Sequence, residues 1–135
     1  LDLNATPDAL PAMAVAACFA EGETRLVNVP QARLKETDRI AVMTAELLKL
    51  GVDVEELPDG MIIRGRHPES STCDSPIIRG AMVEGHDDHR VVMALAVAAL
   101  GGCGEVSIKG AEAADVTFPG FFNLLEKALG RDERE

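Results

Sequence analysis

An internal repeat with an offset of 80 residues dominates this sequence. Helix, glycine stop and strand signals coincide when the chain is aligned with itself at that offset: Asp8 with Asp88, Met13 with Met93, Ala14 with Ala94, Ala16 with Ala96, Gly22 with Gly102, and Leu26 with Val106. Self-similarity at a fixed spacing indicates a supersecondary unit that occurs twice. We expect each unit to run strand, helix, strand, helix and two further strands. The second copy lacks its closing hairpin within these residues, which suggests a fragment of a longer protein.

Apolar runs and turn signals predict a mixed α/β chain. Helices are expected at residues 9–20, 35–50, 91–100 and 119–129, and strands at residues 1–4, 24–29, 77–84 and 105–109, with a hairpin of residues 52–57 and 61–64. Gly51 fits the end of a helix, and Pro58-Asp59-Gly60 fits the hairpin turn. The 135 residues suffice for one domain. Since aromatic residues make up only 3% of the chain, its core must consist of Ala, Val, Leu, Ile and Met.

Charge and cysteine content exclude several classes of protein. A formal net charge of −10 argues against nucleic-acid partners and anionic membrane surfaces, which both require a basic face. No apolar run is long enough to span a membrane. The three cysteines have no C-x-x-C spacing, so we expect neither a disulfide framework nor a metal site, and we expect a reducing cytoplasm. Cys18 and Cys103 are interpreted as small core residues.

Cations are concentrated where a helix is expected to begin, in the run R-L-K-E-T-D-R of residues 33–39. Lys35 and Arg39 are four residues apart and are expected to share a helix face. A helix N-terminus favours anions because of its macrodipole and its unpaired N–H groups. Cations placed there indicate a bound anion such as phosphate or carboxylate. In the alternative interpretation, Glu36 and Asp38 neutralise the two cations on an ordinary solvated surface.

Other polar groups also precede expected helices. Asp88-His89-Arg90 and residues 115–117 are further polar sites, and Arg90 repeats the unusual cation at a helix start. Because loops that enter helices from strand ends gather at one edge of a sheet, we expect these groups to be neighbours. Asp8 is either an ordinary partner of the helix dipole or a general base. His89 is either a capping residue or part of the same site.

Several motifs, taken in order, resemble the C-terminal part of the 5-enolpyruvylshikimate-3-phosphate synthases, the 3-phosphoshikimate 1-carboxyvinyltransferase family. They are P-D-A, L-K-E-T-D-R-I, E-L-L-K-L-G, D-D-H-R-V-V-M-A-L-A-V-A-A-L and T-F-P-G-F-F. The resemblance implies an α/β fold of repeated βαβαββ units of the enolpyruvyl transferase type, with mixed sheets packed around buried helices. It also implies that residues 1–135 are a single-domain fragment of the C-terminal domain of a two-domain enzyme, with repeat units at approximately 1–66 and 76–130.

The family's reaction transfers the enolpyruvyl group of phosphoenolpyruvate to the 5-hydroxyl of shikimate 3-phosphate, in aromatic amino-acid biosynthesis, with no cofactor or metal. By resemblance, the catalytic residues are Asp8, Lys35 and Glu36, and the substrate-binding residues are Gln31, Lys35, Arg39, His89 and Arg90. Val116 departs from the pattern, because some members have Lys at this position.

The implied partners are the two substrates and the N-terminal domain of the same cytoplasmic enzyme, without which this fragment is expected to be inactive. Neither nucleic acid nor membrane is an expected partner. Two alternatives remain open at this point. One is the related enolpyruvyl transferase that acts on UDP-N-acetylglucosamine, and the other is an anion-binding or assembly module without turnover.

Overall fold

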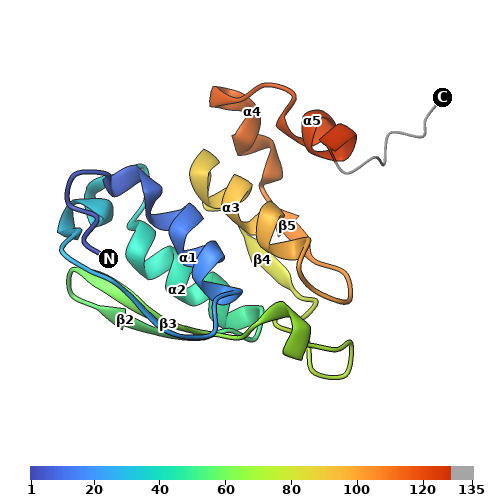
Figure 1. Ribbon diagram of the computed structural model, residues 1–135. Helices are drawn as coiled ribbons and strands as arrows, with labels where there is room; N and C mark the ends of the chain where they lie inside the picture. The colour runs from blue at the N-terminus through green and yellow to red at the C-terminus, as the bar shows by residue number, and fades with distance from the viewer. Residues whose placement is uncertain (129–135) are drawn as a thin grey trace.

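The computed structural model describes residues 1–128, apart from the side chains of Val116 and Thr117. Three helices, α1 (Leu10–Cys18), α2 (Arg39–Lys49) and α3 (His89–Ala99), pack against one another, and α1 and α2 cover one face of a three-stranded sheet (Figure 1). Helix α1 is apolar on all sides, as expected of a helix that is buried between a sheet and neighbouring helices.

The sheet consists of β1 (Gly22–Leu26), β2 (Asp53–Leu57) and β3 (Gly60–Gly65), in the order β1-β3-β2 with antiparallel neighbours. Strands β2 and β3 form the predicted hairpin, closed by the pair Leu57 and Gly60. Gly60 also passes so close to β1 that a Cβ atom there would collide with the carbonyl oxygen of Leu26. Glycine is therefore required here by packing.

The 80-residue repeat is visible in strand pairing. Asp2 forms a parallel bridge with Val27 in the first copy. Met82 and Ser107, each 80 residues further on, begin the parallel pairing of β4 (Met82–Glu84) with β5 (Ser107–Lys109). Short 3-10 helices are present at Pro7–Ala9, Pro30–Leu34, Pro68–Ser70 and Ala111–Ala113, and the chain continues through α4 (Ala114–Thr117) and α5 (Phe121–Ala128). The repeated α/β architecture predicted from the sequence is confirmed.

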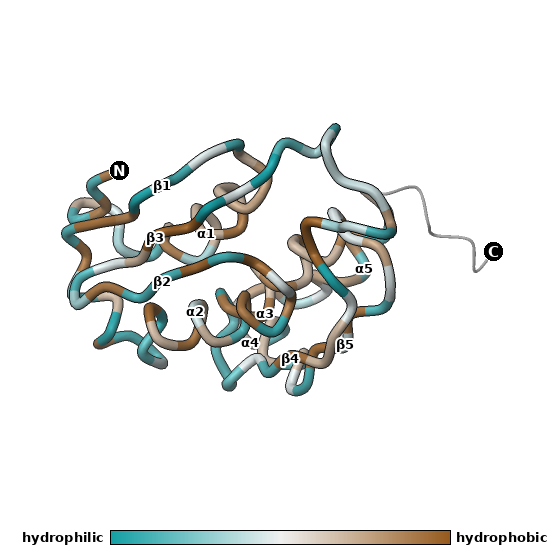
Figure 2. The backbone as a smooth tube through the Cα atoms, turned by 90° about the horizontal axis from the view of Figure 1, so that it is seen from below, coloured by the Kyte–Doolittle hydropathy of each residue, from teal (hydrophilic) through white to brown (hydrophobic). Residues whose placement is uncertain are grey.

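One main core lies between the helices and the three-stranded sheet. Its largest fully buried members include Leu10, Leu26, Ile40, Met43, Leu47, Met61, Ile63 and Leu95. Hydrophobic segments of α1, α2 and β3 lie toward this interior (Figure 2). As predicted, the core is aliphatic, so the helices approach closely through Ala14, Ala17 and Ala98.

Several predicted boundaries are wrong. The second helix begins at Arg39 rather than residue 35, because the Asp38 carboxylate accepts the Ala41 N–H at 3.1 Å and caps the helix there. Residues 1–4 contribute an isolated bridge rather than a strand, and the strand expected at 77–84 is limited to β4. Leu129, the expected end of the last helix, and the charged residues 131–135 lie outside the described residues.

The cysteine prediction is also wrong in part. Cys73 and Cys103 form a disulfide with their Cα atoms 5.4 Å apart, so Cys103 is not a free core thiol. The bond joins the exposed segment after β3 to the turn after α3, two regions whose proximity only the tertiary fold determines. Cys18 is buried, as predicted, and burial raises the pKa of its thiol to about 12.

Within residues 1–128, no helix has the length and apolar character needed to cross a membrane.

Candidate functional site

The site is centred on a buried ion pair between the two repeats. Arg39, at the first position of α2, is 1% exposed, and Asp88, the N-cap of α3, is fully buried. The guanidinium donates from Nε to Oδ2 of Asp88 at 2.8 Å and from Nη2 to Oδ1 at 3.1 Å. This two-point contact fixes the position and the plane of both groups. Burial opposes the charge on Asp88, but hydrogen bonds from Arg39 and Thr37 outweigh burial and lower the pKa of its carboxyl.

Asp88 also organises the entry to α3. One oxygen accepts the Arg90 backbone N–H at 3.0 Å, and the other accepts the Thr37 hydroxyl at 2.9 Å. One carboxylate therefore joins the start of α3 to the segment before α2. Both residues fall within polar helix starts that the sequence indicated, but neither Asp88 nor Thr37 was assigned a role there. The repeat, which aligns Asp88 with Asp8, was the available sequence signal.

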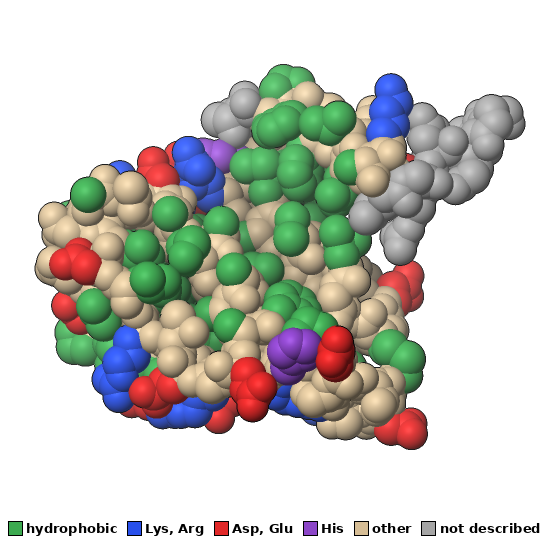
Figure 3. Space-filling model, in the orientation of Figure 1, with side chains coloured by type: hydrophobic (Ala, Val, Ile, Leu, Met, Phe, Trp, Pro, Cys, Tyr) green, Lys and Arg blue, Asp and Glu red, His purple; other side chains and the backbone are tan. Residues whose placement is uncertain are grey.

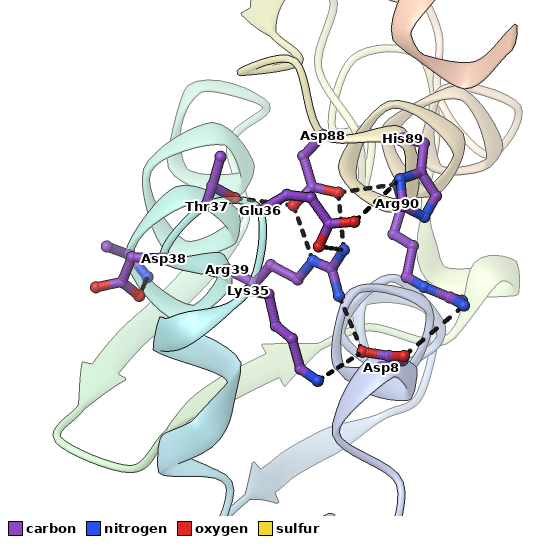
Figure 4. A network of polar contacts seen from close by, with 10 residues as sticks. Asp8, Lys35, Glu36, Thr37, Asp38, Arg39, Asp88, His89 and Arg90 are labelled. Carbon is purple, nitrogen blue, oxygen red and sulfur yellow. Dashed lines mark hydrogen bonds and ion pairs between the residues drawn. The ribbon is translucent and has the colours of Figure 1, made fainter. Parts of the chain in front are cut away.

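Asp8 lies on the open side of this pair and faces three cations (Figure 4). Its Oδ1 is 3.1 Å from Arg39 Nη1 and 3.4 Å from Lys35 Nζ, and its Oδ2 is 3.9 Å from Arg90 Nη2. Burial opposes its charge, but the fields of Lys35 and Arg90 outweigh burial and lower the pKa of the Asp8 carboxyl. Asp8 is therefore an ionised carboxylate. Because its side chain is 49% exposed, it is also within reach of a ligand.

Glu36 completes the polar network from the opposite side. Its Oε1 accepts from Arg39 Nη2 at 3.0 Å, and its Oε2 lies 3.6 Å from His89 Nδ1 (Figure 4). The Arg39 guanidinium is thus surrounded by three carboxylates. A ligand anion can reach Arg39 only if Glu36 or Asp8 moves aside. Both side chains are about half exposed, so such a movement requires no core rearrangement.

The predicted proximity of Asp8, Glu36, Arg39 and Arg90 is confirmed, while their roles stay predictions. Lys35 is brought to the same place, but it does not share a helix face with Arg39, because it precedes α2 in extended conformation. Gln31 lies in the preceding 3-10 helix, Pro30–Leu34, and its amide donates to the Asn4 carbonyl at 2.9 Å. Val116 belongs to α4, and its side chain is outside the described set.

The alternative interpretation, in which Glu36 and Asp38 neutralise Lys35 and Arg39, is correct only for the pair of Glu36 with Arg39. Asp38 pairs with Arg33 instead, at 2.8 Å. Arg33 also pairs with Glu56 at 2.8 Å and donates to the Leu57 and Pro58 carbonyl oxygens. These contacts tie the loop before α2 to the β2–β3 hairpin. Arg33 therefore has a structural role, and Lys35 and Arg90 are the cations on the open side of the site.

A groove of about 190 Å³ between α1 and α3 begins at the charged site. Asp8 and Arg90 lie at one end, and the remaining lining is apolar: Pro11, Ala12, Val15, Met93, Ala94 and Val97. Figure 3 shows hydrophobic side chains gathered over this face of the molecule. Charged groups next to a nonpolar surface lose less of their interaction energy to water than groups on a fully solvated surface.

The polar groups are suited to binding an anion and moving protons. Lys35, Arg39 and Arg90 provide positive charge, while Asp8 and Glu36 are accessible proton acceptors. Among residues 1–128, no group of three or more His, Cys, Asp or Glu is arranged to hold a metal ion.

Comparisons with known proteins agree with the motifs. Residues 1–125 match the family model of EPSP synthase (3-phosphoshikimate 1-carboxyvinyltransferase). The chain is 59% identical over 133 residues to the 3-phosphoshikimate 1-carboxyvinyltransferase of Ruminiclostridium cellulolyticum, covering 98% of this chain and 29% of that protein. It is 49% identical over 127 residues to the enzyme of that name from Halobacterium salinarum, covering 94% of this chain and 27% of the relative.

A solved EPSP synthase from Acinetobacter baumannii has the same fold over this region. The TM-score is 0.84 at 38% sequence identity, and the match covers 93% of this chain and 28% of that structure. The chain thus spans less than a third of the length of these relatives. From the family model, the sequence identity and the shared fold together, we conclude that the chain belongs to the EPSP synthase (3-phosphoshikimate 1-carboxyvinyltransferase) family.

Proposed function

We propose that the enzyme containing this chain transfers the enolpyruvyl group of phosphoenolpyruvate to the 5-hydroxyl of shikimate 3-phosphate. The observation that carries this proposal is the position of Asp8, an accessible carboxylate facing Lys35, Arg39 and Arg90 within a chain of this family. Both substrates are anions, so bringing them into contact requires several fixed cations. The names of the relatives favour this substrate over UDP-N-acetylglucosamine and favour an enzyme over a module without turnover.

The substrate hydroxyl gives its proton to the site as its oxygen attacks the central carbon of phosphoenolpyruvate, and the methylene carbon gains a proton, which forms a tetrahedral adduct. Loss of phosphate and of a proton from the methyl group then forms the enol ether. Lys35 and Glu36 are assigned to this proton traffic. Because the pKa of Asp8 is lowered, Asp8 suits orientation of the hydroxyl and acceptance of its hydrogen bond better than strong base catalysis.

The substrate-binding roles follow the same geometry. Arg90 is assigned to phosphoenolpyruvate, since it is a cation on the open side that the protein's own carboxylates contact only at 3.9 Å. Arg39 also contacts phosphoenolpyruvate when Glu36 turns away. His89 lies beside Glu36, close enough to move together with the Glu36 side chain. Gln31 is assigned to the ring hydroxyls of the second substrate.

We further propose that the N-terminal domain of the same cytoplasmic enzyme provides the opposite wall of the site. The site is open in this chain, with Asp8 and Glu36 half exposed, whereas an addition between two anions must be shielded from water. Closure of one domain on another is a common way to achieve this.

The test uses a chimera in which this chain replaces the matching segment of the Ruminiclostridium cellulolyticum enzyme. We expect release of phosphate that requires both phosphoenolpyruvate and shikimate 3-phosphate, and no release with UDP-N-acetylglucosamine. Asp8→Asn should reduce the rate by about 100-fold, because the reacting hydroxyl loses the carboxylate that orients it. As a matched control, Asp53→Asn changes an exposed carboxylate in β2 that pairs with Arg64, outside the site, and should leave the rate unchanged. A folded chimera that releases no phosphate contradicts the proposal.

A further inference from the structure

A second buried carboxylate, Glu46, connects the two repeats on the same helix as Arg39. Its side chain is 2% exposed, and it lies seven residues after Arg39 in α2. Seven residues correspond to about two helical turns, so both side chains leave the same face of α2, about 10 Å apart. Arg39 contacts the N-cap of α3, and Glu46 contacts the strand that leads to it.

The contacts of Glu46 are directed at the segment between β4 and α3. Its Oε1 accepts the backbone N–H of Glu84 at 2.9 Å, and its Oε2 lies 3.0 Å from His86 Nε2. Lys49 donates to both oxygens at 2.9 and 3.1 Å. Burial opposes the charge, but the bonds from His86, Lys49 and Glu84 outweigh it and lower the pKa of the Glu46 carboxyl.

That segment has an unusual backbone. His86 and Asp87 are consecutive non-glycine residues with positive φ, both at 56°. Such residues are uncommon, and their conformation persists only when surrounding contacts hold it. Gly85 is fixed by its N–H bond to the Lys109 carbonyl at 2.9 Å, and Glu46 fixes the positions on either side of Gly85.

The next residue, Asp88, pairs with Arg39 and accepts the Arg90 N–H. The backbone of residues 84–87 leads directly into this residue, and the Asp88 N–H donates to the Gly85 carbonyl at 3.0 Å. We infer that Glu46 is a positioning residue: by holding the Glu84 N–H and the His86 ring, it sets the placement of Asp88 and Arg90 and hence the affinity of the site for its anionic substrate. This inference rests on the proposed function for its kinetic consequence, but its structural part can be tested separately.

The first test compares three variants in the chimera, assayed well below their melting temperatures. Glu46→Ala is expected to lower kcat/KM for phosphoenolpyruvate by about 10- to 100-fold, mainly through KM, as misplacement of a binding group does. Glu46→Gln keeps an acceptor for the Glu84 N–H and a polar partner for His86, and should remain within about threefold of the parent. Thr44→Val removes another buried polar group of α2, one that donates to the Ile40 carbonyl within the helix, and should leave kcat/KM unchanged.

Hydrogen exchange of the same proteins provides a readout that does not depend on turnover. Peptides covering residues 84–92 should exchange faster in Glu46→Ala than in the parent, and should not do so in Thr44→Val. If Glu46→Ala does not fold, His86→Ala is used instead, since it removes one contact of Glu46 and leaves its pair with Lys49. A smaller increase in the exchange rate of residues 84–92 is then expected.

The outcomes separate the two proposals. An inactive parent chimera contradicts the proposed function, and faster exchange in residues 84–92 still supports the positioning role of Glu46. Unchanged exchange in both Glu46→Ala and His86→Ala overturns that role. So does a kcat/KM of Glu46→Ala within threefold of an active parent, even if the melting temperature falls.

Discussion

Replacement of Asp88 by Asn should destabilise the 135-residue chain by about 3 kcal/mol. Arg39 is 1% exposed and donates two charge-assisted hydrogen bonds to Asp88. Loss of one partner of a buried pair costs about 3–5 kcal/mol, because the other charge is left without compensation. The lower end applies here, since Asp8 and Glu36 still contact the guanidinium and Asn retains the ability to cap α3.

The free energy of unfolding is measured by urea denaturation, with far-UV circular dichroism as the signal. Asp38→Asn is the matched control, because Asp38 is also an N-cap paired with an arginine, but its side chain is 38% exposed. This control should cost less than about 1 kcal/mol. Comparing the same substitution at two helix N-caps then separates the contribution of the buried ion pair to stability from that of ordinary capping.

A double-mutant cycle with Arg39→Met completes this test. Each single change removes one charge of the buried pair and leaves the other without its closest partner, whereas the double variant removes both charges. The double variant should therefore be about 2–3 kcal/mol more stable than the sum of the single effects predicts. Additivity of the two effects within about 0.5 kcal/mol would refute the interpretation that this pair connects the repeats.

Three further predictions concern acid, redox conditions and ligand binding. Because folding lowers the pKa of Asp88, its ionised carboxylate stabilises the fold at pH values above the ordinary pKa of 3.8. This stabilisation is lost as pH falls through the folded-state pKa, so acid titration should destabilise the parent more steeply than Asp88→Asn. Reduction of the Cys73–Cys103 bond, which closes a separation of 30 residues, should lower the free energy of unfolding by about 3–4 kcal/mol, and Cys73→Ser should abolish the response to reductant. In the chimera, Arg90→Ala should weaken phosphoenolpyruvate binding by about 2–5 kcal/mol in a calorimetric titration, and unchanged binding would make Arg90 an ordinary surface residue.

Local sequence signals predicted the elements that local forces determine. The β2–β3 hairpin follows from its Pro58-Asp59-Gly60 turn, and the repeat follows from matched glycines and apolar residues at the 80-residue offset. The grouping of polar helix starts was also predictable, because strand-to-helix loops gather at one edge.

Features that depend on tertiary contacts were missed. The cation run predicted a helix from residue 35, but the capping bond of Asp38 delays the helix start to Arg39. Asp88 belongs to a polar helix start that the sequence indicated, but its pairing with Arg39 spans 49 residues of sequence and was not predicted. The disulfide of Cys73 and Cys103 likewise joins loops that no spacing rule relates.

Phosphate release by the isolated 135-residue chain, alone and mixed with the N-terminal remainder of the Ruminiclostridium cellulolyticum enzyme, tests the proposed division of the site between two parts. We expect no release above background from the chain alone, because loss of substrate orientation can remove about 7–11 kcal/mol of barrier lowering. Mixing should restore release that requires phosphoenolpyruvate and shikimate 3-phosphate together. Sustained phosphate release from the chain alone would contradict the proposal that the chain carries only one part of the site. A stable complex of the two parts that releases no phosphate would contradict it as well.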